Sequence, residues 1–391
     1  MPEVVQEDTV DDRSATAAVL EAARALGPAF EAATRQAEVE RTLPQSVVEQ
    51  MREAGLFWLK TPKSLGGSEL DPVGFCDVVE EIAYHDASAA WAVMIGNGVT
   101  GTFAGWLPDE GVEDLFPEGG PLPIMAGQFV PRGVAVAVPG GYRVTGRWSF
   151  SSGIMHSSWV AGAARVEGGE PGEEILLCVP KSSATVHDIW FVAGLEGTGS
   201  NDFSLEDVFV PASHTRRRAD APPQRGGPLF RQPQSLFVAN EITPVAVGIA
   251  RRALDDIVVL ARATVRGATG VPLIDRAAFQ KTLGRAEAKW LAARLVYRAA
   301  VQEAWDRSVE GLPFDDGIVA TLRSRHTFAV ETCTELVAEV FRYGGGRVLA
   351  LNNPMQRHYR NLIAATQHVA NTEENYELAA MAIVERSDDE S

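Results

Sequence analysis

The sequence predicts an α+β protein with three successive parts: an N-terminal helical domain over 1–120, a central β domain over 121–214 and, after a linker at 215–235, a C-terminal four-helix bundle over 236–391. Two changes along the chain carry this prediction, because helical spacing of apolar residues gives way to short β-branched runs and then returns. Length is the third observation, since 391 residues exceed what one ordinary hydrophobic core organises.

The N-terminal domain is predicted from helical periodicity. Residues 15–41 are rich in Ala, Glu and Leu at helical spacing, and Pro44 stands where a second helix begins. Residues 72–94 repeat the pattern, with one apolar stripe formed by Val73, Phe75, Val78, Val79 and Ile82. The first third of the chain is therefore expected to be helical.

The central domain is predicted from period-two alternation. Val134, Val136 and Val138 alternate with other residues in one of several β-branched runs that glycines separate. The letters PGG before Tyr142 indicate a hairpin turn. These runs predict a small β-rich unit between the helical parts.

The bundle follows an exposed connection rich in Arg, Pro and Gly. Apolar residues then return to helical spacing in four segments, roughly 236–265, 274–307, 315–343 and 354–385. Four amphipathic segments joined by Gly- or Pro-bearing breaks are typical of a four-helix bundle.

Composition excludes several classes of partner. The chain has 35 Lys and Arg against 52 Asp and Glu, a formal net charge of −17, whereas nucleic acid and anionic membranes need clustered cations. No apolar run reaches the ~20 residues that cross a bilayer, and the acidic start MPEVVQEDTVDDRS is unlike a signal peptide. Cys76, Cys178 and Cys333 form no CxxC pair, so we expect a cytoplasmic protein without a metal site or disulfides.

The stretch GRWSFSSGIMHSSW, residues 146–159, has an unusual composition. It holds two Trp, one His, two Gly and five Ser, with no Lys and no acid. A solvated loop would carry more charge, and a core strand fewer hydroxyl groups. From composition alone it is either a polar strand with core tryptophans or a segment that contacts a ligand.

The order of the parts and four sequence words resemble the acyl-CoA dehydrogenase superfamily. The words are AGLFWLKTPKSLGG, GGYRVTGRWSFSSG, GTGSNDFSLEDVFVP and PMQRHYRNLIAATQHV, and the resemblance covers about Leu43 to Val384. It implies a helical N-terminal domain, a β-barrel-like central domain and a C-terminal four-helix bundle. It also implies that the residue 146–159 segment lines a flavin ring.

The resemblance implies roles for several residues of the central domain. Phe150 and Trp148 would contact the flavin, and Gly127 would let the backbone approach the ring. Trp148 is also compatible with a core residue of the β domain. Ser151 and Ser152 would offer hydroxyl or backbone NH groups to the ring edge. In GTGSNDF, Ser200 and Asn201 are weaker candidates.

The resemblance also implies a site for the flavin phosphate or dinucleotide tail. Arg266, Gln280 and the run Gly344, Gly345 and Gly346 match positions that hold this tail in relatives, often across a subunit boundary. A shared site implies a homo-oligomer, by resemblance a tetramer. The glycine run is also what a plain helix C-cap would contain.

The last helix separates two kinds of chemistry. A dehydrogenase needs a carboxylate base facing the flavin, but the matching stretch reads Arg360, Asn361 and then Gln367, His368 and Val369, with neither expected acid. Glu241 lies near an alternative base position but about a full turn early. The sequence therefore resembles the branch of two-component flavin monooxygenases.

That branch takes reduced FMN or FAD from a separate flavin reductase and reacts it with O2 to give a C4a-hydroperoxide. It implies hydroxylation of a small organic molecule, whether aromatic, polyketide or amine. The implied catalytic residues are Ser151, His156 and His368, and Asn97 and Gln367 are candidates for contact with the substrate. Asn97 stands where phenol hydroxylases often carry a histidine, which widens the range of substrates.

Other interpretations stay open at this point. His368 is also compatible with a packed bundle histidine, and His156 with a residue that satisfies local backbone. The chain lacks a GxGxxG fingerprint, so tight binding of NAD(P)H is not expected. The alternatives in function are an acyl-CoA dehydrogenase with a displaced base such as Glu241, and a non-catalytic relative that binds flavin or another ligand.

Overall fold

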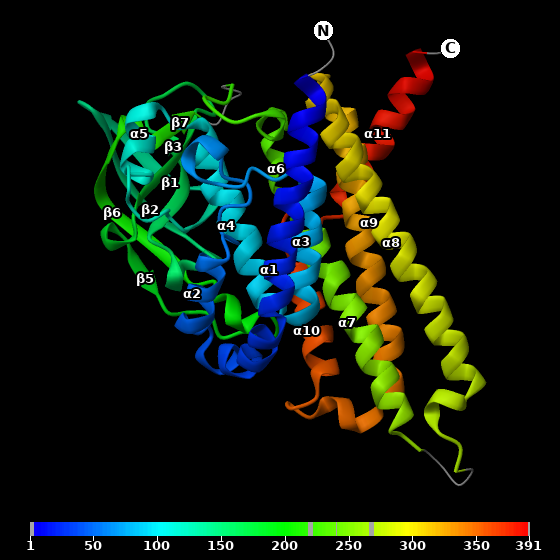
Figure 1. Ribbon diagram of the computed structural model, residues 1–391. Helices are drawn as coiled ribbons and strands as arrows, with labels where there is room; N and C mark the ends of the chain where they lie inside the picture. Colours follow the sequence, from blue (N-terminus) through cyan, green and yellow to red (C-terminus); the bar gives the residue numbers. More distant parts are fainter. Residues whose placement is uncertain (1–3, 218–221, 240, 266–269, 390–391) are drawn as a thin grey trace. The chain divides into compact units, whose positions relative to one another are not determined.

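The computed structural model describes residues 4–217, 222–239, 241–265 and 270–389 (Figure 1). Contacts divide the chain into two compact units. Unit 1 comprises Met1–Asp71, Trp91–Phe191 and Glu196–Arg231, and unit 2 comprises Pro72–Ala90, Val192–Leu195 and Gln232–Ser391. The three-domain boundaries stay a prediction, whereas the predicted fold class is confirmed.

Unit 1 combines helices with one sheet. Its helices are α1 (Val4–Glu40), α2 (Gln45–Glu53), most of α4 (Ala87–Trp106) and α5 (Asp109–Leu115). Its strands are β1 (Met125–Val138), β2 (Gly141–Trp148), β3 (Trp159–Val166), β4 (Glu174–Pro180), β5 (Thr185–His187), β6 (Asp202–Pro211) and β7 (Thr215–Arg217). The predicted β-rich stretch thus forms the sheet.

The sheet has the strand order β5-β6-β2-β1-β3-β4-β7. The predicted PGG hairpin joins β1 and β2, which pair antiparallel with Val136 opposite Arg143. The β1–β3 pair is parallel, so the chain from β2 to β3 has to cross over. The residue 146–159 stretch contains this crossover, and the short turn η2 (Ile154–His156) lies within it.

Trp148 is the centre of the sheet's core. Its ring stacks on Phe203 with centroids 5.0 Å apart, and its indole NH donates to the Ala163 carbonyl at 2.9 Å. A Cβ at Gly162 would lie 2.7 Å from the indole, and one at Gly133 2.5 Å. Gly133 of β1 and Gly162 of β3 are therefore required by the size of this one side chain.

Unit 2 is a helical bundle. Its long helices are α3 (Pro72–His85), α7 (Ile242–Arg262), α8 (Ala277–Glu310), α9 (Asp316–Phe341), α10 (Pro354–Thr366) and α11 (Glu374–Asp389), and the short α6 (Gln234–Ala239) precedes α7. Figure 1 shows α7, α8 and α9 running side by side. The predicted first segment is thus α6 plus α7, and the predicted fourth is two helices, α10 and α11, separated by a turn at residues 367–373.

Close contacts and ion pairs hold α3 on the bundle. Gly248 of α7 brings the helices together, since a Cβ there would lie 2.4 Å from the Glu80 carbonyl oxygen. Arg294 and Arg298 of α8 pair with Glu80 at 2.7 Å and with Asp77 at 2.6 Å, respectively. Burial raises the pKa of Glu80, and the two arginines oppose that rise. In the part of the chain that the structure describes, no helix is long and apolar enough to span a bilayer.

We predict opposite effects on stability from adding one methyl group at two glycines. Gly162→Ala should lower the free energy of unfolding by roughly 1–3 kcal/mol, because the rigid Trp148 ring has to move. Gly284→Ala on α8 has open space around it and should raise that free energy by up to about 1 kcal/mol through helix propensity. Urea unfolding of both variants measures the difference, and equal midpoints would contradict this account of the core.

Candidate active site

Phe150 has a strained backbone and an exposed ring. It lies just after the end of β2, and its φ of +64° is in the left-handed region that favours glycine. Its side chain is 64% exposed, and its ring meets Trp190 edge-on with centroids 6.2 Å apart. Strain of this kind is found mainly at functional sites, and an exposed aromatic ring on it offers a flat apolar wall to a ligand.

The backbone NH groups that follow Phe150 are already used. Ser151 N–H donates to the Asn201 carbonyl at 3.1 Å, Ser152 N–H to the Phe150 carbonyl at 2.9 Å, and Gly153 N–H to the Thr198 carbonyl at 2.8 Å. The expectation that Ser151 and Ser152 offer backbone NH groups to a flavin edge is therefore wrong. Only their hydroxyl groups remain as donors.

The two serine hydroxyls differ in their surroundings. Ser152 Oγ lies 2.6 Å from Ser200 Oγ and accepts from the Trp91 indole NH at 3.1 Å, and Ser200 Oγ also lies 2.7 Å from the hydroxyl of Thr198. Ser151 Oγ is buried and has no hydrogen-bond partner within the described residues. Because an unsatisfied buried hydroxyl is costly, Ser151 is the serine whose geometry calls for a ligand.

His156 presents a second unsatisfied group. It ends η2, the turn that begins after Gly153 with its φ of +79°, and its ring lies 5.6 Å from the Phe57 ring. Both ring nitrogens are buried without a hydrogen-bond partner in the described ranges. Burial, with a contribution from the nearby Lys181 charge, lowers the pKa of His156 to about 4. The imidazole is thus neutral near pH 7, with one donor and one acceptor nitrogen.

Asn201 connects the two sides of this site. Its side-chain oxygen accepts from the backbone NH groups of Ile189 at 3.0 Å and Trp190 at 3.1 Å, while its own carbonyl holds Ser151. The resemblance gives Asn201 only a weak role as a cofactor contact. Its observed contacts instead make it a brace for Trp190 and Ser151, which no local pattern could reveal.

Three predicted site residues have other roles. Trp148 is 0% exposed in the sheet core, so its ring has no face free for a flavin. Gly127 is explained by strand packing, because a Cβ there would lie 2.3 Å from the Ala161 carbonyl oxygen. Asn97 is also 0% exposed; its side-chain NH2 donates to Leu56 and Val93, and its oxygen accepts from Lys60 N–H. The polar groups of Trp148 and Asn97 are thus occupied within the protein, whereas the backbone contact predicted for Gly127 stays a prediction.

His368 in unit 2 is a neutral imidazole with a defined tautomer. It lies in the turn after α10, where its Nδ1 accepts from Ala370 N–H at 3.2 Å, so the ring proton is on Nε2. Burial lowers the pKa of His368 to about 4. Gln367 is exposed and donates to the Thr366 hydroxyl at 3.1 Å. Val369, in the register of the dehydrogenase carboxylate, is 68% exposed and aliphatic.

Asn361 and Glu241 complete the comparison with a dehydrogenase. Asn361 replaces the family's aspartate, and its side-chain oxygen accepts from Leu195 N–H at 2.8 Å. Leu195 itself has a φ of +54°, so Asn361 holds a strained segment rather than a substrate. Glu241 is 1% exposed and precedes α7.

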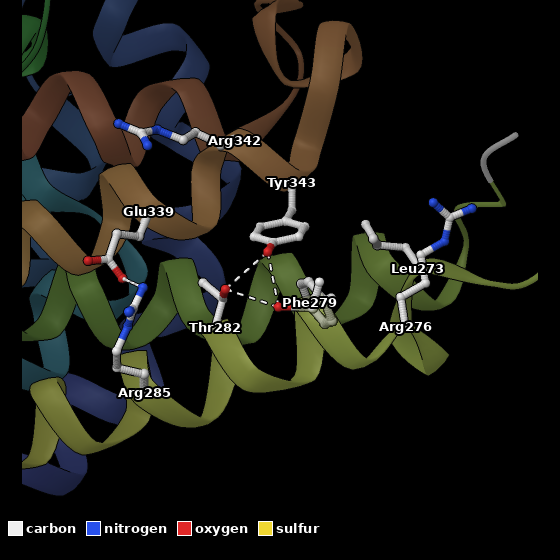
Figure 2. Close-up of a pocket in the computed structure, with 9 residues that line it drawn as sticks. Leu273, Arg276, Phe279, Thr282, Arg285, Glu339, Arg342 and Tyr343 are labelled. Carbon is white, nitrogen blue, oxygen red and sulfur yellow. Dashed lines mark hydrogen bonds and ion pairs between the residues drawn. The ribbon is translucent and has the colours of Figure 1, made fainter.

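Two cavities lie at the η8 (Arg342–Leu349) end of α8 and α9. One has a volume of about 550 Å³ and is lined by Arg276, Arg285 and Arg342 among others. Figure 2 shows the Tyr343 hydroxyl pointing toward the Thr282 hydroxyl, 3.0 Å away, and Arg285 pointing toward Glu339. The cavity's other lining residues include Glu339, which pairs with Arg285 at 3.0 Å. Three arginines against one acid make this cavity cationic in a chain of net charge −17, which suits a phosphate.

The second cavity, of about 510 Å³, contains part of the predicted glycine run. Gly345 and Gly346 line it with Arg347, Thr264 and Val265. Gly345 has a φ of +60°, and a Cβ at Gly346 would meet no atom, so the backbone there is open. Gly344 is instead required by packing, because a Cβ there would lie 2.0 Å from the Val348 side chain.

Two further residues, Gln280 and Arg266, are predicted to hold the flavin phosphate or dinucleotide tail. Gln280 is exposed, and its side chain donates to the Ile274 carbonyl at 3.1 Å. Arg266 lies outside the described residues. Among the residues that are described, no group of three or more His, Cys, Asp or Glu has a metal-binding arrangement.

Comparison with known proteins agrees with this geometry. Family models match in two places: "Acyl-CoA dehydrogenase, N-terminal domain" at residues 15–106 and "Acyl-CoA dehydrogenase, C-terminal domain" at 241–373. The chain is 31% identical to indole-3-acetate monooxygenase of Pseudomonas putida, over 92% of this chain and 93% of that one. It is 28% identical to the oxygenase component of an FADH2-dependent resorcinol hydroxylase of a Rhizobium species, over 87% of both chains.

A solved structure is similarly close. XiaF from a Streptomyces species, determined with FADH2 and glycerol, has a TM-score of 0.90 with this chain and 27% identity, and the match covers 97% of this chain and 98% of that one. The two matches to named monooxygenases and this structure with bound FADH2 all involve nearly the whole chain.

The buried histidine of unit 1 should make stability depend on pH. An unfolded histidine takes up a proton near pH 6.5, whereas His156 in the fold does so only near pH 4. Acid therefore favours the unfolded chain, and the contribution of His156 is lost as pH falls from about 6.5 to 4. Between pH 6.5 and 4 the unfolding free energy should fall by up to about 3 kcal/mol less in His156→Gln than in the wild type.

Urea unfolding at a series of pH values measures this dependence. His187→Gln, in the same unit, controls for removal of an imidazole as such. Parallel curves for the wild type and His156→Gln would contradict a neutral, buried His156.

Proposed function

Because this chain belongs to the acyl-CoA dehydrogenase family and is one of the flavin-dependent monooxygenases that share its fold, we propose that it hydroxylates a small aromatic compound at the Phe150–His156 site. The reaction uses reduced flavin and O2. The observation that carries the proposal is a set of buried polar atoms without a partner among the described residues, Ser151 Oγ and the two ring nitrogens of His156, on the same short segment as the exposed Phe150 ring.

The residues present fit a flavin. An isoalloxazine needs an apolar wall and a few hydrogen-bond donors for its edge. Phe150 supplies the wall, and the Ser151 hydroxyl supplies a donor, since the neighbouring NH groups are used elsewhere. When bound, reduced flavin supplies the electrons with which O2 is activated.

Ser151 and the two neutral histidines handle protons in this proposal. The Ser151 hydroxyl donates a hydrogen bond to an acceptor at the flavin edge, in a position shielded from water. His156 accepts the proton of a substrate hydroxyl or NH group at whichever ring nitrogen is unprotonated. In unit 2, Nδ1 of His368 accepts from Ala370 N–H, so the proton that this ring carries is on Nε2.

An aromatic substrate is favoured by the character of the site in unit 1. Phe57 lies against His156, and Trp91 donates to Ser152 beside it, so the surroundings are flat, apolar rings with few donors. Indole-3-acetate and resorcinol, the compounds in the names of two relatives, are aromatic. Gln367 remains a candidate for contact with the substrate, since its side chain is exposed.

The dehydrogenase alternative lacks support from the residues. Val369 and Asn361 replace the acids that desaturation of a thioester needs, and Asn361 is occupied with Leu195. The similarity to proteins named monooxygenases also favours hydroxylation with O2 over desaturation of a thioester. The same similarity disfavours a non-catalytic relative.

The proposal extends to partners and location. A separate flavin reductase supplies the reduced flavin, as the two-component organisation of the resorcinol hydroxylase suggests. The cationic cavity and the open backbone of Gly345 would hold the flavin phosphates in a homotetramer. Cys76, Cys178 and Cys333 are buried and form no disulfide among the described residues, which supports a reducing, cytoplasmic location.

We predict that Ser151→Ala uncouples the reaction. The variant loses the hydroxyl that the proposal places at the flavin edge, so the ratio of hydroxylated product to O2 consumed should fall about tenfold, the equivalent of one hydrogen bond. Hydrogen peroxide should rise to match. Product and peroxide are measured with reduced flavin supplied by a reductase and a panel of indoles and phenols.

Ser183→Ala is the matched control, because this serine is exposed on the same unit. It should leave the ratio unchanged. Full coupling in Ser151→Ala, with an unchanged melting temperature, would contradict the proposed role.

We also predict the pH profile of coupling. The pKa values of His156 and His368 are lowered to about 4, so both rings are neutral above about pH 5. Coupling should therefore be flat from about pH 8 to about pH 5.5 and fall as pH approaches the pKa of about 4. His368→Gln should lower coupling at all pH values, and a drop centred near pH 6.5, the ordinary histidine value, would contradict the assignment.

A further inference from the structure

Lys181 holds the turn that carries His156. It follows β4 as the first residue of η3 (Lys181–Ser183), and its Nζ donates to the carbonyls of Ile154 at 3.1 Å and Met155 at 3.0 Å. Its backbone NH also donates to the Ser158 carbonyl at 2.9 Å. The residue at the end of β4 thus binds the 154–158 segment at both of its ends.

These contacts are where a short turn needs them. The carbonyls at the end of a helical turn favour a nearby cation. The Ile154 carbonyl also accepts from the Ser157 hydroxyl at 3.1 Å, so Lys181 adds a second donor there and binds the Met155 carbonyl as well. The side chain of Lys181 is half-buried, and burial lowers its pKa. A fully exposed lysine would not lose this hydration. The two hydrogen bonds to carbonyls of the turn offset the loss at Lys181.

That turn fixes the direction of the His156 ring. The ring nitrogen Nε2 lies over Gly153, so close that a Cβ added there would be 3.1 Å away, and Phe57 covers another side of the ring. Neither contact involves a hydrogen bond to the imidazole. The position of the ring therefore depends on the backbone of residues 154–156, which Lys181 binds.

Lys181 is also the charged group that acts on this imidazole among the described residues. The other groups against the ring, Phe57 and Gly153, carry no charge. The ammonium disfavours a second proton on the imidazole in addition to the effect of burial. Geometry and charge thus act in the same direction, towards a neutral, fixed ring.

We propose that Lys181 is a positioning residue for the His156 imidazole, acting through the two carbonyls that its ammonium group binds. The role in turnover rests on the proposed function of His156, whereas the role in fixing the ring does not. Loss of the ammonium should leave the fold in place while the ring becomes mobile and easier to protonate.

Three substitutions separate the contributions. Lys181→Met removes the charge and the donors at similar length, Lys181→Arg keeps both, and Lys181→Gln keeps donors without charge. Arg165→Met is the control, because it removes an exposed cation from strand β3 of the same unit. Circular dichroism checks the fold, and Lys181→Leu, which likewise removes the charge and the donors, replaces Lys181→Met in every comparison if the latter does not fold.

The first measurement needs no turnover. The ring Cε1–H signals of the protein's seven histidines are recorded by NMR against pH, with the His156 signal assigned from His156→Gln. In Lys181→Met the His156 signal should shift and its titration should move to higher pH, and Lys181→Arg should restore both. An unchanged His156 signal and titration in Lys181→Met would overturn the proposal, whatever its activity.

The second measurement is coupling with the aromatic panel. Lys181→Met should lower product per O2 about fivefold, a change on the scale of one lost hydrogen bond. Lys181→Arg keeps the donors and should remain within about twofold of the wild type. Arg165→Met should match the wild type. If Lys181→Arg is as impaired as Lys181→Met while its His156 signal is native, the role in turnover is overturned.

A wild type that hydroxylates nothing counts against the proposed function, and the NMR result then still decides whether Lys181 positions the ring.

Discussion

The backbone hydrogen bonds between residues 151–153 and the segment 198–201 are the constraint on which the site in unit 1 depends. They fix the left-handed conformation of Phe150, and they use up NH groups that would otherwise face a ligand. The chemistry is therefore left to side chains. Ser151 and His156 are buried, polar and unpartnered within the described chain, an arrangement that is costly unless a bound molecule completes it.

The neutral imidazole of His156 distinguishes the site in unit 1 from that of a dehydrogenase, and His368 in unit 2 is a neutral imidazole as well. A carboxylate would attract a proton from carbon, whereas a neutral imidazole can donate from one nitrogen and accept at the other without carrying a charge into a dry pocket. Burial is the main cause of this neutrality at both His156 and His368. The fold is thus shared with the dehydrogenases, while the protonation states suit hydroxylation.

The order of helices, sheet and bundle could be predicted from the sequence, because periodicity is a local property. The break between α10 and α11 could not, since the apolar spacing continues across it. The candidate Ser151–His156 segment could be found only through the resemblance. The resemblance implies ligand contact for Trp148 and Asn97, but the sequence around each residue cannot show that Ala163, Phe203, Leu56 and Lys60 contact them from other parts of the chain.

The left-handed backbone at Phe150 sets folding stability against cofactor affinity at a single residue. A glycine would relax the main chain there by roughly 1 kcal/mol, and yet it would delete the exposed ring that the proposed function places against the flavin. Selection for thermal stability alone would favour glycine at position 150 and would remove the aromatic ring. A chain with phenylalanine at this point accepts a slightly weaker fold in exchange for a surface suited to a planar cofactor.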